Sequence, residues 1–233
     1  MLIMDGFLNY QTLIISYVIT LPLWAFAVWK TKKTLKSKYI PTLAIGSAFC
    51  LIIMMFDIPV FGRLTGHAIG ATLLSLIFGP WASSIIISIT LAIQALFFEN
   101  GGILSLAANS LIIGFLASFT GYYSYKFLIS LFPNEIRAKM LASGISGYIS
   151  LVIASIFIGI ILGIQPLLNY TANSTSLYFP NSFKISIPLM LIGHILIFGW
   201  VEFIITALSL GFLLKEKSPV LNFSKEDLSL IIN

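Results

Sequence analysis

Runs of apolar residues long enough to cross a lipid bilayer recur along the chain and constrain its fold more than any other feature. A membrane-spanning helix needs about 20 such residues, and the segment from Gln11 to Trp29 is the first of several near that length. Only 9% of the residues are charged, whereas a water-soluble domain of this size needs more polar surface. The alternating pattern of a transmembrane barrel is absent, and backbone groups in lipid must be satisfied within each segment. The sequence therefore predicts an all-α, polytopic membrane protein.

Seven helical segments are expected, and one of them is unusually short. They lie at about 11–29, 39–56, 67–78, 81–98, 103–128, 140–164 and 185–214. The third rises only ~18 Å at 1.5 Å per residue, which is short of the ~30 Å hydrocarbon core. Such a segment is tolerated where it is buried in protein or lines a cavity. We expect residues 1–214 to form a single transmembrane domain of about seven helices and residues 215–233 to form a cytoplasmic tail.

Lysine and arginine residues are concentrated between the apolar runs, where they predict the orientation of the chain. The loop KTKKTLKSK at 30–38 is the densest cluster. If this loop is cytoplasmic, the alternation of the helices places every Lys and Arg except Arg63 and Lys184 on the cytoplasmic side. The sequence therefore predicts an external amino terminus and a cytoplasmic carboxyl terminus. The net charge of +5 is explained by this topology, so no nucleic-acid partner is expected.

The amino-terminal stretch MLIMDGFLNY has no positively charged region and no small-residue cleavage site ahead of the first apolar run. A removable signal peptide is therefore not expected, and the first residues should remain in the mature protein.

Motifs for covalent chemistry are missing from the sequence. It has no G-x-x-x-x-G-K-[ST] phosphate loop, no H-E-x-x-H helix and no G-x-S-x-G elbow. Cys50 has no partner for a disulfide within the chain. The triplet at 173–175 matches a glycosylation sequon, a pattern that often arises by accident. We therefore expect a protein that is not an enzyme and that has no permanently bound cofactor.

Small and polar residues inside the apolar runs predict a packed bundle. The pairs Gly66/Gly70 and Gly159/Gly163 have GxxxG spacing, which permits close helix approach. Gln94 and Asn109 are expected to form interhelical hydrogen bonds. Glu202 must face protein or water, because an ionised carboxylate near the bilayer centre costs roughly 2.5–3.5 kcal/mol or more. It is expected to pair with a helix terminus or to form a docking contact near the cytoplasmic side.

The two histidines, His67 and His194, are the candidate ligands in the chain. His67 stands between glycines at the mouth of the short third segment. It is either a ligand that faces the interior or an interfacial residue that ends a loop. His194 and Glu202 are eight residues apart, about 12 Å along a helix, and are not expected to touch each other.

Three blocks of sequence, in this order, resemble the CbiM/NikM family, the membrane-embedded, substrate-binding S components of energy-coupling factor importers for cobalt and nickel. They are TGHAIGATLLSLIFGPWA (Thr65–Ala82), QALFFENGGILSLAANS (Gln94–Ser110) and GWVEFIITAL (Gly199–Leu208). The opening MLIMDGFL is similar to the family's amino-terminal signature, which usually begins Met-His-Ile. The resemblance runs, with gaps, from Met1 to about Leu214. It implies seven helices and an external amino terminus folded into the bundle of a prokaryotic cell-membrane protein.

The resemblance also implies a metal site near the amino terminus. In the family its four donors are the amino-terminal amine, the backbone nitrogen and imidazole of the second residue, and the histidine of the TGH block. In this chain the Met1 amine, the backbone nitrogen of Leu2 and the imidazole of His67 would supply three of them. Four nitrogens in a plane suit Ni(II), and Co(II) less decisively. The transported Ni(II) or Co(II) would be the substrate rather than a cofactor. The motif TGHAIGA resembles that of the nickel-type members of the family more than that of the cobalt-type members.

Position 2 departs from the family pattern, because Leu2 stands where the family usually has a ligating histidine. Three explanations remain open at this point. Another donor, of which His194 is the candidate, replaces the missing imidazole. The scaffold carries a different substrate, such as an organic solute or another metal. The change abolishes metal binding altogether.

The resemblance further implies partner subunits, since the chain itself has no phosphate loop. These would be a transmembrane coupling protein, a pair of ATPases and a small accessory membrane subunit. A membrane enzyme or a regulatory subunit is the contrasting class. It would need an external acid/base pair, and the external acidic residues Asp5, Asp57 and Glu99 have no obvious partner in the sequence.

Overall fold

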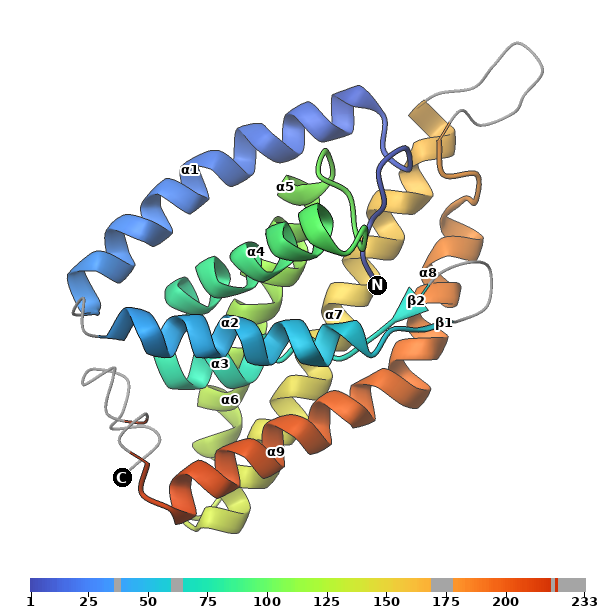
Figure 1. Ribbon diagram of the computed structural model, residues 1–233. Helices are drawn as coiled ribbons and strands as arrows, with labels where there is room; N and C mark the ends of the chain where they lie inside the picture. The colour runs from blue at the N-terminus through green and yellow to red at the C-terminus, as the bar shows by residue number, and fades with distance from the viewer. Residues whose placement is uncertain (36–38, 60–64, 169–177, 219–220, 222–233) are drawn as a thin grey trace.

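The computed structural model describes residues 1–35, 39–59, 65–168, 178–218 and 221, and most of them are helical (Figure 1). The helices are α1 (Tyr10–Thr34), α2 (Ile40–Met55), α3 (Ala71–Phe78), α4 (Pro80–Phe97), α5 (Leu106–Asn109), α6 (Ala117–Ile129), α7 (Ile136–Leu168), α8 (Phe183–Gly193) and α9 (Gly199–Lys215). Two π-helical stretches, η3 (Ser110–Leu116) and η4 (His194–Phe198), join α5 to α6 and α8 to α9. Strands β1 (Ile58–Pro59) and β2 (Thr65–Gly66) form a two-residue antiparallel pair.

Five helical spans among the described residues are long and apolar enough to cross a membrane. They are Tyr10–Thr34, Pro80–Phe97, Leu106–Ile129, Ile136–Leu168 and Phe183–Lys215. The prediction of an all-α polytopic membrane protein is thus confirmed. The other two expected segments are shorter helices, α2 of 16 residues and α3 of 8 residues. The count of seven crossings and the external amino terminus stay predictions.

The long helix α7 forms the spine of the bundle, packing against α6, α8 and α9. Helix α1 lies along the outside (Figure 1) and leaves most of its apolar side chains exposed. In a bilayer such side chains face lipid, so their exposure costs nothing there.

The short third segment differs most from expectation. It begins as strand β2 and an extended stretch, and only from Ala71 does it become helix α3. Gly70 precedes the helix with a φ of 75°, a left-handed conformation in which glycine is favoured. All eight residues of α3 are buried in the bundle, as expected for a helix too short to cross a bilayer alone. His67 therefore lies in an extended segment and not at the first turn of a helix.

Glycine pairs have different roles at the two predicted GxxxG positions. Gly159 and Gly163 of α7 lie against the backbone of α8, where added Cβ atoms would come within 3.0 Å of Ile187 Cα and 2.8 Å of Phe183 Cα. Close helix approach is confirmed there. Gly66 and Gly70 lie outside any helix, so the helix-packing interpretation of that pair is wrong.

Several of the predictions concern residues outside the described part of the chain, or isolated groups. Arg63 and the triplet at 173–175 lie outside the described residues, as does most of the predicted tail. Cys50 is free and buried, as expected for a lone thiol.

Candidate metal site

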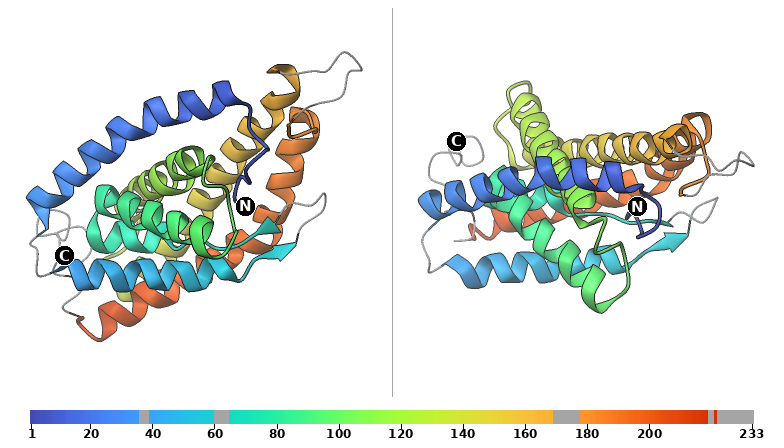
Figure 2. Two further views of the ribbon diagram at one scale, coloured as in Figure 1. Left: turned by 45° about the horizontal axis from the view of Figure 1, so that its top comes forward. Right: turned by 90° about the horizontal axis from the view of Figure 1, so that it is seen from above.

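The amino-terminal segment runs inward from the start of α1 and ends inside the bundle (Figures 1 and 2). Met1, Leu2 and Ile3 are all buried, with exposed fractions of 1%, 7% and 0%. A free chain end is usually exposed and poorly ordered unless other parts of the fold hold it. The burial of three consecutive residues indicates that specific contacts hold this end in place.

Asn109 of α5 supplies the most direct of these contacts. Its Oδ1 accepts a hydrogen bond from the backbone N–H of Ile3, and its Nδ2 donates one to the carbonyl of the same residue, both at 2.9 Å. The side chain therefore pairs with the backbone of Ile3 as a neighbouring strand would. Sequence reasoning expected an interhelical hydrogen bond at Asn109, and the structure shows a bond to the amino-terminal segment instead.

Asp5 fastens the same segment to the loop that precedes α5. Its carboxylate accepts hydrogen bonds from the backbone N–H groups of Ile103 and Ser105, at 2.9 and 3.0 Å. Gly102 approaches so closely that an added Cβ would lie 1.9 Å from Asp5 Oδ1. Asp5 therefore has a structural role, which leaves no support for it as half of an acid/base pair.

The Met1 amino group lies against strand β2. It donates hydrogen bonds to the carbonyl oxygen and to Oγ1 of Thr65. This group precedes α1, and its burial lowers its pKa from the usual 8.0 to about 5, while the negative charge of Asp57 opposes the shift. At pH 7 such an amine is uncharged, so its lone pair is available to a metal ion.

His67 follows β2 by one residue and is completely buried. Its Nδ1 lies 3.0 Å from the carbonyl oxygen of Ala68, which can only accept a hydrogen bond. Nδ1 therefore carries the proton, and in the neutral ring Nε2 has a bare lone pair. No described residue forms a hydrogen bond with Nε2. These features favour the ligand interpretation of His67 over that of an interfacial loop residue.

His194 begins the π-helical stretch η4 and is also buried. Electrostatic interactions connect its imidazole with the Met1 amine and with His67, so the three groups lie near one another. Strand β2 positions His67 near His194. Gly66 of this strand has no side chain, so the ring of Phe198 packs directly against it, and an added Cβ at Gly66 would lie 2.1 Å from that ring. The ring of Phe198 in turn packs on His194, with centroids 5.3 Å apart.

Leu2 provides no side-chain donor to this site. Its side chain packs against Gly101, where an added Cβ would lie 3.3 Å from Leu2 Cδ1. The described residues contain no group of three or more His, Cys, Asp or Glu side chains placed to hold a metal ion. A metal site here must therefore combine imidazoles with nitrogens of the amino terminus.

Glu202 of α9 holds the segment that carries His67. Its carboxyl oxygens accept hydrogen bonds from the backbone N–H of Ile69 at 2.7 Å and from that of Gly70 at 3.1 Å. These N–H groups lie at the amino-terminal end of α3, where a carboxyl group is favourable. Of the two roles expected for Glu202, the structure supports the pairing with a helix terminus.

Replacing Glu202 with alanine is expected to lower the melting temperature of the purified protein in detergent. The change leaves two buried N–H groups without acceptors and costs about 3 kcal/mol, or roughly 6–12 °C in a chain of this size. Glu202→Gln keeps one acceptor oxygen and should lose about half as much. Equal melting temperatures for all three proteins would contradict the assigned role.

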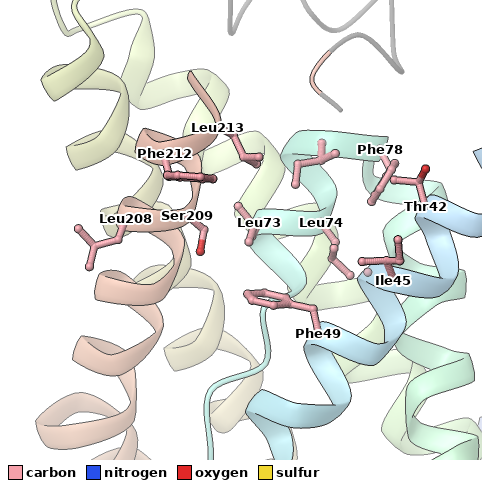
Figure 3. Close-up of a pocket in the computed structure, with 12 residues that line it drawn as sticks. Thr42, Ile45, Phe49, Leu73, Leu74, Phe78, Leu208, Ser209, Phe212 and Leu213 are labelled. Carbon is pink, nitrogen blue, oxygen red and sulfur yellow. The ribbon is translucent and has the colours of Figure 1, made fainter. Parts of the chain in front are cut away.

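A separate apolar cavity of about 460 Å³ lies between α2, α3 and α9, where Phe49, Leu74 and Phe212 are among the side chains that face it (Figure 3). None of its lining residues is ionisable. It therefore offers a cation neither charge nor imidazole nitrogen, and it is not a metal site.

The structure brings together Met1, His67 and His194 of the predicted site residues and turns the Leu2 side chain toward Gly101. Sequence reasoning missed the roles of Asp5, Thr65 and Phe198. None of the three carries a local sequence signal, because each role depends on contacts with residues far along the chain.

A family model described as the cobalt uptake substrate-specific transmembrane region matches residues 3–220. A probable fused nickel transport protein, LarMN, of Lactiplantibacillus plantarum is 37% identical over 92% of this chain and 64% of its own length. The fused nickel transport protein NikMN of Rhodobacter capsulatus is 32% identical over 87% of this chain and 58% of its own length. The chain thus spans less than two thirds of either fused relative.

Among solved structures, a crystal structure of a transition metal transporter has a TM-score of 0.89 and 43% identity to this chain. The match covers 97% of this chain and 99% of the other.

Proposed function

The chain belongs to the family of cobalt uptake substrate-specific transmembrane regions, and from this premise we propose that it is the metal-binding membrane component of a nickel or cobalt importer. Its family is one of multi-pass transport proteins of the membrane and not of enzymes. The ion would bind from outside near the amino terminus and leave toward the cytoplasm when partner subunits change the conformation of the bundle. Residues 1–214 would form the transport domain.

One observation carries the proposal. The Met1 amine and the His67 imidazole, two nitrogen donors from opposite ends of a stretch of more than sixty residues, are buried close enough to interact electrostatically. The Leu2 backbone nitrogen adjoins the amine through the chain itself and, on losing its amide proton to solvent when the ion binds, would close a five-membered chelate ring. Nitrogen donors of this kind suit Ni(II) and Co(II) rather than Mg²⁺ or Ca²⁺.

Energy for transport would come from separate ATPase subunits acting through a transmembrane coupling protein, with a small accessory membrane subunit as a further partner. The chain contributes no phosphate loop of its own. The fused nickel relatives extend beyond the region that this chain matches, which agrees with a role for additional protein in transport.

An organic solute is the less favoured substrate. Relatives that match most of this chain are named as nickel transport proteins, and the buried groups near the amino terminus are nitrogen donors.

Titration of the metal-free protein in detergent with nickel, cobalt and magnesium salts tests the proposal. We expect one nickel ion per chain, weaker binding of cobalt, as the Irving–Williams order requires, and no heat from magnesium. The C-terminally tagged protein should be used so that the amino group stays free. Absence of both nickel and cobalt binding would refute the proposed function.

A further inference from the structure

We propose that His194 supplies the nitrogen donor that Leu2 cannot, so that the ion is held by the Met1 amine, the Leu2 backbone nitrogen and Nε2 of both His67 and His194. This inference rests on the proposed function and adds a ligand from the opposite end of the chain. The bound ion would therefore link the first residues of the chain to η4.

The protonation of His194 is that of a metal ligand. Its Nδ1 lies 2.6 Å from the carbonyl oxygen of Met190 and must donate to it, because a carbonyl oxygen has no proton to give. Nε2 of the neutral ring is then unprotonated and carries a free lone pair. Histidines that bind metals almost always donate their other ring N–H to a carbonyl, a carboxylate or water, which fixes the tautomer and the ring orientation. His67 has the same arrangement with Ala68.

Burial makes the unpaired Nε2 atom informative. His194 is 1% exposed, and its Nε2 has no hydrogen-bond partner among the residues that the structure describes. Buried polar atoms are nearly always paired, so an unpaired one needs an explanation. Two imidazoles near each other share this property, and a bound cation would satisfy both.

The backbone around His194 is also unusual for a membrane-spanning helix. The π-helical stretch η4 begins at this residue and lies between α8 and α9. Such stretches are rare and frequently occur at functional sites. Here the stretch places Phe198 against both His194 and Gly66, and so holds the imidazole beside the strand that leads to His67.

Asp57 is the competing donor, since its Oδ1 is buried without a hydrogen-bond partner in the described part of the chain and its charge interacts with the Met1 amine. A carboxylate oxygen suits Mg²⁺, Ca²⁺ or Mn²⁺ better than nickel, for which imidazole is preferred. The negative charge of Asp57 is better placed to compensate the charge of the bound ion than to replace an imidazole.

Two variants test the inference: the single variant His194→Asn and the double variant that combines it with Leu2→His. The asparagine amide can still donate to the Met190 carbonyl but has no lone-pair nitrogen. We expect His194→Asn to weaken nickel binding at least about tenfold and to move the Ni(II) d–d absorption band to longer wavelength, because fewer nitrogens bind the ion. Leu2→His in the same background should restore the affinity and the band position. The melting temperatures of the metal-free proteins show whether each variant folds.

The outcomes separate this inference from the proposed function. If the unmodified protein binds neither nickel nor cobalt, the proposed function fails. If it binds nickel and His194→Asn binds equally well, only the role of His194 is overturned, and a loss confined to Asp57→Asn would assign the donor to that carboxylate. A folded His194→Asn variant that loses binding and is not rescued by Leu2→His would also overturn the inference. Should His194→Asn not fold, retained nickel binding and an unchanged d–d band in His194→Gln would overturn it.

Discussion

A Gly-Ser extension ahead of Met1 is expected to abolish nickel binding. The extension turns the Met1 amine into an amide, so the site loses the primary amine that anchors the ion and assists loss of the Leu2 amide proton, together with its chelate ring. The added residues also have no room, because Met1 is 1% exposed and its amino group donates hydrogen bonds to Thr65. We expect affinity to fall by a factor of more than about 100, or about 2.7 kcal/mol of binding free energy.

Isothermal titration of the extended protein measures this loss. The matched control is the same fusion after cleavage by a protease that leaves Met1 as the first residue, and binding should return in full. A second control carries Gly-Ser after Asn233. Undiminished nickel affinity in the extended protein would exclude the amine as a donor and with it the site proposed here.

Replacing His67 with alanine should have an effect of similar size. The variant removes Nε2, and among the described residues its imidazole gives up just one hydrogen bond, the local one from Nδ1 to the carbonyl of Ala68. Nickel affinity should therefore fall by a factor of about 100, with a smaller effect on the melting temperature of the metal-free protein. Equilibrium dialysis against nickel with metal analysis of the protein measures it.

Tyr125→Phe is the control for the loss at His67. It removes a different buried polar atom, a hydroxyl on α6 that has no hydrogen-bond partner within the described residues. Nickel binding should be unchanged in this variant. Equal affinity of His67→Ala and the unmodified protein would show that the imidazole is not a ligand.

The membrane-spanning helices could be predicted from length and hydropathy because lipid leaves the backbone few alternatives. The segments from Gln11 to Trp29 and from Met140 to Ile164 correspond to α1 and α7 with small shifts of their ends. A backbone shielded from lipid by protein is less constrained, and there the prediction failed. Residues 65–70 form a strand and an extended turn because β1, Phe198 and Glu202 surround them.

The site was predictable only as a set of residues. The sequence and the family resemblance singled out Met1, His67 and His194, but their proximity depends on contacts between distant parts of the chain. Glu202 and Ile69 are 133 residues apart, and Ile3 and Asn109 are 106 apart. No local pattern records such pairings.

The burial of the amino terminus constrains the order in which parts of the chain can fold during synthesis. Residues 3 and 9 are among the first to leave the ribosome, yet the backbone of Ile3 bonds to Asn109 and that of Asn9 bonds to Gln165. Neither contact can exist until its later partner has been translated and inserted. The earliest residues of the chain must therefore wait beside an unfinished bundle and dock near the end of folding, so the proposed metal site is completed only after most of the polypeptide has been made.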